Sequence, residues 1–187
     1  KDLPWGYANT NGKPSASLSV VANGDGKALE FKSTDADGAA VGPNVTDTSY
    51  IYEVTFTTPK EGTNVGVTNA TWGADSAATI SSAYWFAAKA GVNAAYRINS
   101  VGKAIQYFDS VKEKFYSYGS GDTISANTEY TFKIVCLDGT NYYFINDRYY
   151  GTHTPTEYLT TYSDGTGGQL GLYTYGGTLN VTAMTVK

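Results

Sequence analysis

Acidic residues and one histidine are the side chains that acid–base chemistry would use in this chain. The glutamates are scattered along it, at Glu30, Glu53, Glu61, Glu113, Glu129 and Glu157. Hydrolysis of a glycosidic bond needs two carboxyl groups roughly 5–9.5 Å apart. Glu53 and Glu113 could meet across a sheet, but no motif places them there, and His153 in "GTHTPTE" has no nucleophile motif beside it. We therefore expect these residues to lie on solvated surfaces rather than in an active site.

Tyrosine and tryptophan offer a different chemistry, because each combines a large apolar ring with a polar edge. The chain has 17 Tyr and 3 Trp against 7 Phe, which favours rings that meet water over rings that are only buried. Such rings can stack on the C–H face of a sugar, while short polar groups or an arginine fork bind its hydroxyls. The predicted ligand-binding residues are Trp72, Trp85, Arg97, Tyr116, Tyr118, Arg148, Tyr149, Tyr173 and Tyr175.

Each of these predictions has a structural alternative. Trp72 lies in the polar stretch "TNATWGADS" and is either a platform or the anchor of a loop. Trp85 alternates with Tyr84 in a strand, so one of the two should leave the main core. Arg97 should face outward in the same way. Tyr116 and Tyr118 form either a paired platform or a cross-strand contact.

The remaining candidates lie in the C-terminal third. Arg148 and Tyr149 follow an Asn-Asp turn, where a solvated hairpin tip is the alternative to a ligand contact. Tyr173 and Tyr175 share a parity opposite Leu172, and a second packed layer explains them equally well.

Calcium is the metal that the sequence could accommodate. Asp25 in "NGDGK" (23–27) and Asp35 and Asp37 in "DADG" (35–38) lie in short Asp/Gly segments read as loops. Calcium takes oxygen ligands of this kind, although Asx turns explain both segments without an ion. We expect no required cofactor and a structural calcium ion as an option.

The elements that must position these residues are strands. Short β-branched or aromatic runs alternate with period two and are separated by Gly, Asn, Asp or Pro. They occupy residues 15–21, 27–33, 49–58, 64–69, 83–90, 93–99, 104–110, 114–118, 129–137, 141–147, 168–175 and 178–187. About a dozen short strands predict an all-β antiparallel sandwich, in one domain covering residues 1–187. Residues 74–85, the best helical candidate, are expected to form a loop.

Parity predicts which face of each strand is buried. Tyr50, Tyr52, Val54 and Phe56 share one face of their strand. In the predicted strand over residues 129–137, one face is likewise shared by Tyr130, Phe132, Ile134 and Cys136. Both sets should face the core, and Cys136 should be a buried small hydrophobe.

Composition excludes several classes of partner. A formal net charge of −4 and a pI near 4.9 give no electrostatic basis for binding nucleic acid or an anionic membrane. No apolar run is long enough to predict a membrane span. The single cysteine excludes an internal disulfide. Because no leader precedes Lys1, we expect a mature protein or an excised module.

The C-terminal third resembles the end of concanavalin-A-like (laminin-G-like) jelly rolls. The resemblance rests on "NTEYTFKIVCLDGTNYYFINDRYYGT", followed after a spacer by "GGQLGLYTYGGTLNVTAMTV". It implies a hairpin closed at Asn146-Asp147, a Gly168–Gly176 strand, and a final strand that closes against the N-terminal one. The Glu-x-Asp-x-x-Glu strand of the jelly-roll glucanases is absent.

Within that superfamily the chain is most similar to a carbohydrate-binding module of a bacterial polysaccharide-degrading enzyme. The resemblance implies a noncatalytic, secreted module that binds polysaccharide and is linked to catalytic or scaffold domains. Two alternatives stay open, a glycoside-active enzyme with an unusual carboxylate pair and a cell-surface adhesin domain that binds protein.

Overall fold

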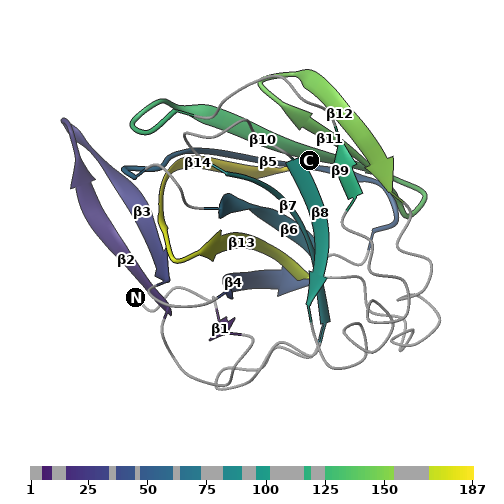
Figure 1. The fold of residues 1–187 in the computed structure, drawn as a ribbon, viewed down its shortest axis with the longest axis horizontal. Helices are drawn as coiled ribbons and strands as arrows, with labels where there is room; N and C mark the ends of the chain where they lie inside the picture. The colour runs from purple at the N-terminus through teal and green to yellow at the C-terminus, as the bar shows by residue number, and fades with distance from the viewer. Residues whose placement is uncertain are drawn as a thin grey trace.

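Two antiparallel sheets form the fold, as Figure 1 shows. The computed structural model describes residues 6–9, 16–33, 37–44, 47–60, 64–72, 82–89, 96–101, 116–118, 125–153 and 169–187. Sheet A contains, in spatial order, β1 (Gly6–Asn9), β4 (Asp37–Asn44), β13 (Gln169–Tyr175), β6 (Asn64–Trp72), β7 (Ser82–Lys89), β8 (Tyr96–Val101) and β9 (Tyr116–Tyr118). Sheet B contains β12 (Arg148–His153), β11 (Thr140–Ile145), β10 (Tyr130–Leu137), β5 (Tyr50–Thr57), β14 (Thr178–Val186), β3 (Gly26–Ser33) and β2 (Ala16–Asn23).

This architecture confirms the predicted all-β antiparallel sandwich. Within the described ranges every regular element is a strand, and no helix there could span a membrane. The structure adds two strands that the sequence reading left out, β1 and β4. The predicted loop over residues 35–38 is wrong from Asp37 onward, because Asp37 begins β4. The predicted strand over residues 104–110 and residues 74–81 of the predicted loop lie outside the described part of the chain. The rest of that loop, residues 82–85, is wrong, because β7 begins at Ser82.

The core lies between the sheets and is built from the faces that parity predicted. Tyr52, Val54 and Phe56 of β5 are fully buried, as are Phe132 and, within 1%, Ile134 of β10. Sheet A contributes apolar residues from β6 and β13 to the same cluster, namely Val65, Val67, Leu170 and Leu172. Cys136 is 6% exposed, and burial raises the pKa of its thiol, which suits the predicted small hydrophobe.

A buried tyrosine side chain connects the two sheets through this core. The hydroxyl of Tyr52 on β5 donates a hydrogen bond of 3.0 Å to the backbone oxygen of Gly171 on β13. Burial raises the pKa of Tyr52 above its usual range, so the phenol stays protonated as a donor. A buried tyrosine of this kind packs its ring while its hydroxyl satisfies a carbonyl.

The β10–β11–β12 segment confirms the predicted hairpin at Asn146-Asp147. Both turn residues have positive φ, 47° at Asn146 and 63° at Asp147, which a two-residue type I′ turn requires and Asn or Asp tolerates. The Asn146 side chain also accepts a hydrogen bond of 2.9 Å from the Thr131 backbone amide. Tyr143 and Ile145 face the core, while Tyr142 and Phe144 are half-buried on the other face.

Candidate functional site

Residues predicted to bind ligand come together on the face of sheet A that is turned away from the core. In antiparallel strands, directly opposed residues share a face. Leu172 and Val67 oppose each other and belong to the core, so the row of opposed residues that contains them faces the core. The neighbouring row therefore lies on the opposite face and reads Ala39, Tyr173, Gly66, Ala87, Arg97 and Ser117. We call this surface the outer face of sheet A.

Two further rows complete the outer face of sheet A. One passes through Gly171, Thr68, Trp85 and Asn99. The other passes through Asp37, Tyr175, Asn64 and Lys89. The predicted ligand residues Trp85, Arg97, Tyr173 and Tyr175 thus occupy positions on one face, although β13 is far in sequence from β7 and β8.

The composition of this face differs sharply from that of the core side. Aromatic positions alternate with glycine and alanine, and with positions that carry amide, hydroxyl, ammonium or guanidinium groups. Glycine and alanine place little bulk above the sheet, and Gly66, Gly171 and Tyr173 on this face are buried.

Tyr173 is a buried residue of the outer face of sheet A. Its flanking partners are Ala39 and Gly66, and its side chain is only 3% exposed. A tyrosine that is this well covered belongs to the floor of the face and is not a freely exposed ring. The second packed layer that the sequence allowed at this position therefore describes Tyr173 well, and its contact with a ligand stays a prediction.

The register separates the other predicted platform residues from this face. Tyr116 and Tyr118 of β9 lie opposite Ile98 and Tyr96, on the same side of the sheet as the Leu172 row. Trp72 lies opposite Ser82 at the end of β6, beyond an irregularity between Thr68 and Ala70. That irregularity places Trp72 on the Phe86 side of the sheet. Their binding roles stay predictions.

Arg148 and Tyr149 lie on sheet B, at the hairpin tip. Tyr149 is 54% exposed, and its ring packs at 59° to Phe144 with centroids 5.6 Å apart. The guanidinium carbon of Arg148 lies 5.5 Å from the ring centroid of Tyr150. The Nζ atom of Lys133 lies 5.4 Å from the Phe144 centroid. This aromatic group is a second surface, separate from the outer face of sheet A.

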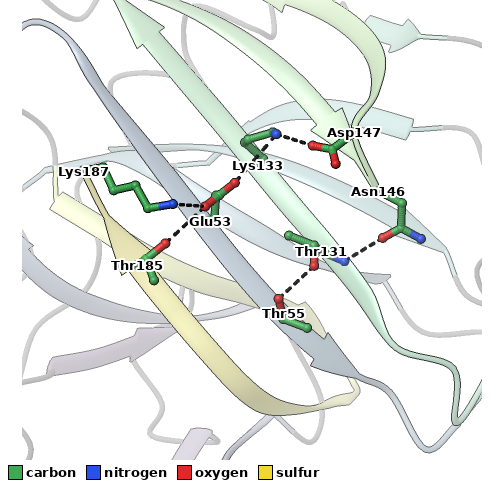
Figure 2. Close-up of polar contacts among 8 residues, drawn as sticks. All are labelled: Glu53, Thr55, Thr131, Lys133, Asn146, Asp147, Thr185 and Lys187. Atoms are coloured by element: carbon green, nitrogen blue, oxygen red, sulfur yellow. Dashed lines mark hydrogen bonds and ion pairs between the residues drawn. The ribbon is translucent and has the colours of Figure 1, made fainter.

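A charged network runs across three strands of sheet B, as Figure 2 shows. Glu53 on β5 accepts hydrogen bonds from Lys187 Nζ at 3.2 Å and from Thr185 Oγ1 at 3.3 Å. The Nζ atom of Lys133 on β10 lies 3.7 Å from Oε1 of Glu53 and also contacts Oδ1 of Asp147. The hydrogen bond from Lys187 holds the pKa of Glu53 below its usual value, and the contact with Asp147 raises the pKa of Lys133.

This network bears on whether Glu53 can act as an acid. A general acid in glycoside hydrolysis needs a raised pKa so that it carries a proton at the working pH. The pKa of Glu53 is shifted in the opposite direction, so it is held ionised by its lysines. Its predicted counterpart, Glu113, lies outside the described residues. His153 ends β12, at a position opposite Asn141.

The predicted calcium ligands are not brought together in the described part of the chain. Asp25 lies in the exposed two-residue turn between β2 and β3, where Gly24 has φ of 54°. Asp37 begins β4 opposite Tyr175, and Asp35 lies outside the described residues. Among the described residues no group of three or more His, Cys, Asp or Glu side chains could hold a metal.

Sequence reasoning missed some residues that share the outer face of sheet A. Thr68, Asn99, Asn64 and Lys89 occupy it beside Trp85 and Tyr175. Alternation within one strand is readable from sequence, but register between strands is not. The irregularity after Thr68 changes which β6 residues share a face with Trp85, and no local sequence signal marks it.

Solved structures with this fold are identified at low sequence identity. The carbohydrate-binding module CBM66 from Bacillus subtilis has a TM-score of 0.60 at 14% identity, over 99% of this chain and 96% of that chain. A protein of unknown function with a galectin-like fold, also from Bacillus subtilis, has a TM-score of 0.61 at 13% identity, over 97% and 88%. Alginate lyase A1-II′, a member of polysaccharide lyase family 7, has a TM-score of 0.57 at 12% identity, over 91% and 83%.

The sequence comparisons add nothing to this, since no family model and no curated protein matches the chain. The predicted likeness to a jelly-roll carbohydrate-binding module is confirmed as a likeness of fold. At sequence identities this low, the similarity shows a shared fold but does not assign roles to individual residues. The function must therefore be argued from the chain's own surfaces.

Proposed function

We propose that this chain is a noncatalytic carbohydrate-binding module that binds polysaccharide on the outer face of sheet A. The observation that carries the proposal is the register, which gathers the positions of Trp85, Arg97 and Tyr175 on the same face as the buried Tyr173. Aromatic rings stack on the apolar faces of sugar rings, and arginine and amide groups bind the hydroxyls along their edges. The similarity in fold to a carbohydrate-binding module supports the same reading.

The noncatalytic part of the proposal is supported by the state of the carboxylates. Glu53, one member of the predicted acid pair, is engaged by Lys187 and Lys133 and has a lowered pKa. Binding in the proposed module would act by targeting, because a linked enzyme held near polymer meets its substrate at a higher effective concentration. We propose accordingly that the chain works outside a bacterial cell, joined to catalytic or scaffold domains.

Affinity electrophoresis against a panel of neutral and acidic polysaccharides tests the proposal. We expect retardation by at least one polysaccharide, with a dissociation constant of about 10–100 μM for a short oligosaccharide. Trp85→Ala and Arg97→Ala should each weaken binding about tenfold or more, with the folded state checked by circular dichroism. Tyr149→Ala removes an exposed ring from sheet B and should leave binding unchanged.

Two outcomes would contradict the proposal in different ways. Loss of binding in Tyr149→Ala but not in Trp85→Ala would move the site to the hairpin of sheet B. Absence of retardation by every polysaccharide, with tryptophan fluorescence also unchanged, would favour the adhesin alternative. Release of new chain ends from a bound polysaccharide would show catalysis and contradict the noncatalytic role.

Metal dependence is tested separately. The proposed binding needs no cofactor, and a structural calcium ion at Asp25, Asp35 or Asp37 stays a prediction. A calcium ion bound only by the folded chain would raise the melting temperature. Melting temperatures in calcium and in excess chelator should therefore differ if the ion binds.

A further inference from the structure

The free edge of β2 is the feature that carries a further inference. β2 is the outermost strand of sheet B, and it lies at the far left of Figure 1. No described strand pairs with its other side. Most of its residues are exposed, and Val20 is 59% exposed despite being apolar. An open edge of this kind presents backbone N–H and C=O groups to another strand.

The β2–β3 hairpin determines which backbone groups are open. Asn23 and Gly26 oppose each other across the two-residue turn Gly24–Asp25. A turn of this length is closed by a hydrogen-bonded pair, and hydrogen-bonded pairs then alternate along the ladder. The odd-numbered residues of β2 therefore bond to β3. The backbone groups of Ala16, Leu18, Val20 and Ala22 point away from β3.

The two edges of sheet B differ in how they are protected. Natural edge strands usually carry charge, proline or a bulge that discourages pairing. β12, at the other edge, carries Arg148 and pairs with β11 through an irregularity between Tyr143 and Phe144. β2 reads ASLSVVAN, with no charged residue and no proline, and its pairing with β3 is regular along its whole length. The edge of β2 therefore lacks the features that usually prevent pairing with another strand.

We propose that β2 pairs with β2 of a second copy of this chain, antiparallel about a two-fold axis at Ser19. In this register each residue with outward backbone groups opposes another, so Leu18 faces Val20 of the second copy and Ala16 faces Ala22. Ser19 faces itself as a pair without backbone hydrogen bonds, where side chains come closest. The two copies of sheet B become one continuous sheet.

A second copy fits this edge better than an unrelated strand because the edge is self-complementary. A two-fold axis brings every residue near its own counterpart, so a charged edge would place like charges opposite each other at a cost. β2 carries no charge, so this cost is absent. The register also covers the exposed side chain of Val20 with Leu18, which already packs against the core.

The expected result for the full chain is a dimer mass that appears as concentration rises from about 1 to 100 μM, measured by sedimentation velocity. Ser19→Lys places two ammonium groups opposite each other at the axis and should raise the dimer dissociation constant about tenfold or more. Ser19→Glu should do the same with two carboxylates. The two variants mixed in equal amounts should recover the dimer, because opposite charges then meet at the axis.

Val186→Lys is the matched control, since it adds a lysine at a 50% exposed position of β14 that pairs with Tyr52 of β5, on a strand that β3 separates from β2. It should keep the mass of the unmodified chain. A chain that stays monomeric at 100 μM would overturn the proposal, as would a mass that grows without limit beyond a dimer. Failure of the mixed variants to recover the dimer would overturn the register at Ser19.

Discussion

Glu53 shows how a single side chain can be assigned a structural role by its surroundings. It accepts hydrogen bonds from Lys187 and Thr185 and lies beside Lys133 on the exposed side of sheet B. A glutamate in a strand with this parity could equally face a cleft, so sequence alone left it as a candidate acid. The contacts that decide its state come from β10 and β14, far away along the chain.

The lowered pKa of Glu53 predicts a dependence of stability on acid. Because this pKa is lower in the folded chain than in the unfolded chain, the contribution of Glu53 is fully present above the unfolded value of about 4.3 and is lost as the pH falls through the folded value. Glu53→Gln should lower the free energy of unfolding by less than about 1 kcal/mol at pH 7, since the group is near the surface. The difference should disappear once the pH has fallen below the folded pKa of Glu53.

Urea denaturation of both proteins between pH 3 and 7 measures this difference. Glu129→Gln is the control, because Glu129 is exposed and its described contact is one hydrogen bond from Thr182. It should change the free energy of unfolding little at any pH. A Glu53→Gln difference that stays constant over the whole pH range would show that the lysines do not act on the ionised carboxylate.

Which side chains face the core could be predicted from the sequence for strands that are buried on one face only. The inward set of β5 and the exposed Tyr149 followed from the two-residue period and from the turn. Tyr116 and Tyr118 could not be placed in the same way, because their side of sheet A depends on pairing with β8. Which positions share a face across several strands is a property of register, and register is set by long-range packing.

At the scale of elements, the β11–β12 turn concentrates several stabilising features in two residues. Asn146 has φ of 47° and accepts the Thr131 amide, and Asp147 contacts Lys133. Turn chemistry of this kind is local, which explains why the hairpin was predicted from sequence. β4 was missed for the opposite reason. Its sequence DGAAVGPN contains two glycines and a proline, and it is a strand because β1 and β13 pair with it.

Substitutions at Asn146 should separate the two contributions of this turn. Asn146→Gly keeps the positive φ at no steric cost but loses the hydrogen bond to Thr131, which predicts a loss of about 1 kcal/mol in the free energy of unfolding. Asn146→Ala loses both the hydrogen bond and the tolerance of positive φ, so it should cost about 1 kcal/mol more. Denaturant titration of the three proteins gives both differences. Equal losses in the two variants would show that φ carries no strain here.

At the scale of the whole molecule, the two proposals combine. A dimer joined through β2 carries two outer faces of sheet A, and a polymer long enough to reach both would bind by two contacts. Ser19→Lys should therefore weaken binding to long polysaccharide by about tenfold or more while leaving binding to a short oligosaccharide unchanged. Isothermal titration with both ligands makes the comparison, and Val186→Lys serves as the control. Equal losses for both ligands would place Ser19 near the sugar instead.

The position of β14 has a consequence for how this chain reaches its structure. β14 begins at Thr178 and lies between β3 and β5, both of which belong to the first third of the sequence. During synthesis, the edges of β3 and β5 that pair with β14 stay open until residues 178–186 have been made, and the buried faces of these two strands include Phe31, Tyr52 and Phe56. Contacts between such distant segments form slowly, and the waiting strands are prone to pair with other chains. The risk of misassembly is therefore highest before β14 has been synthesised.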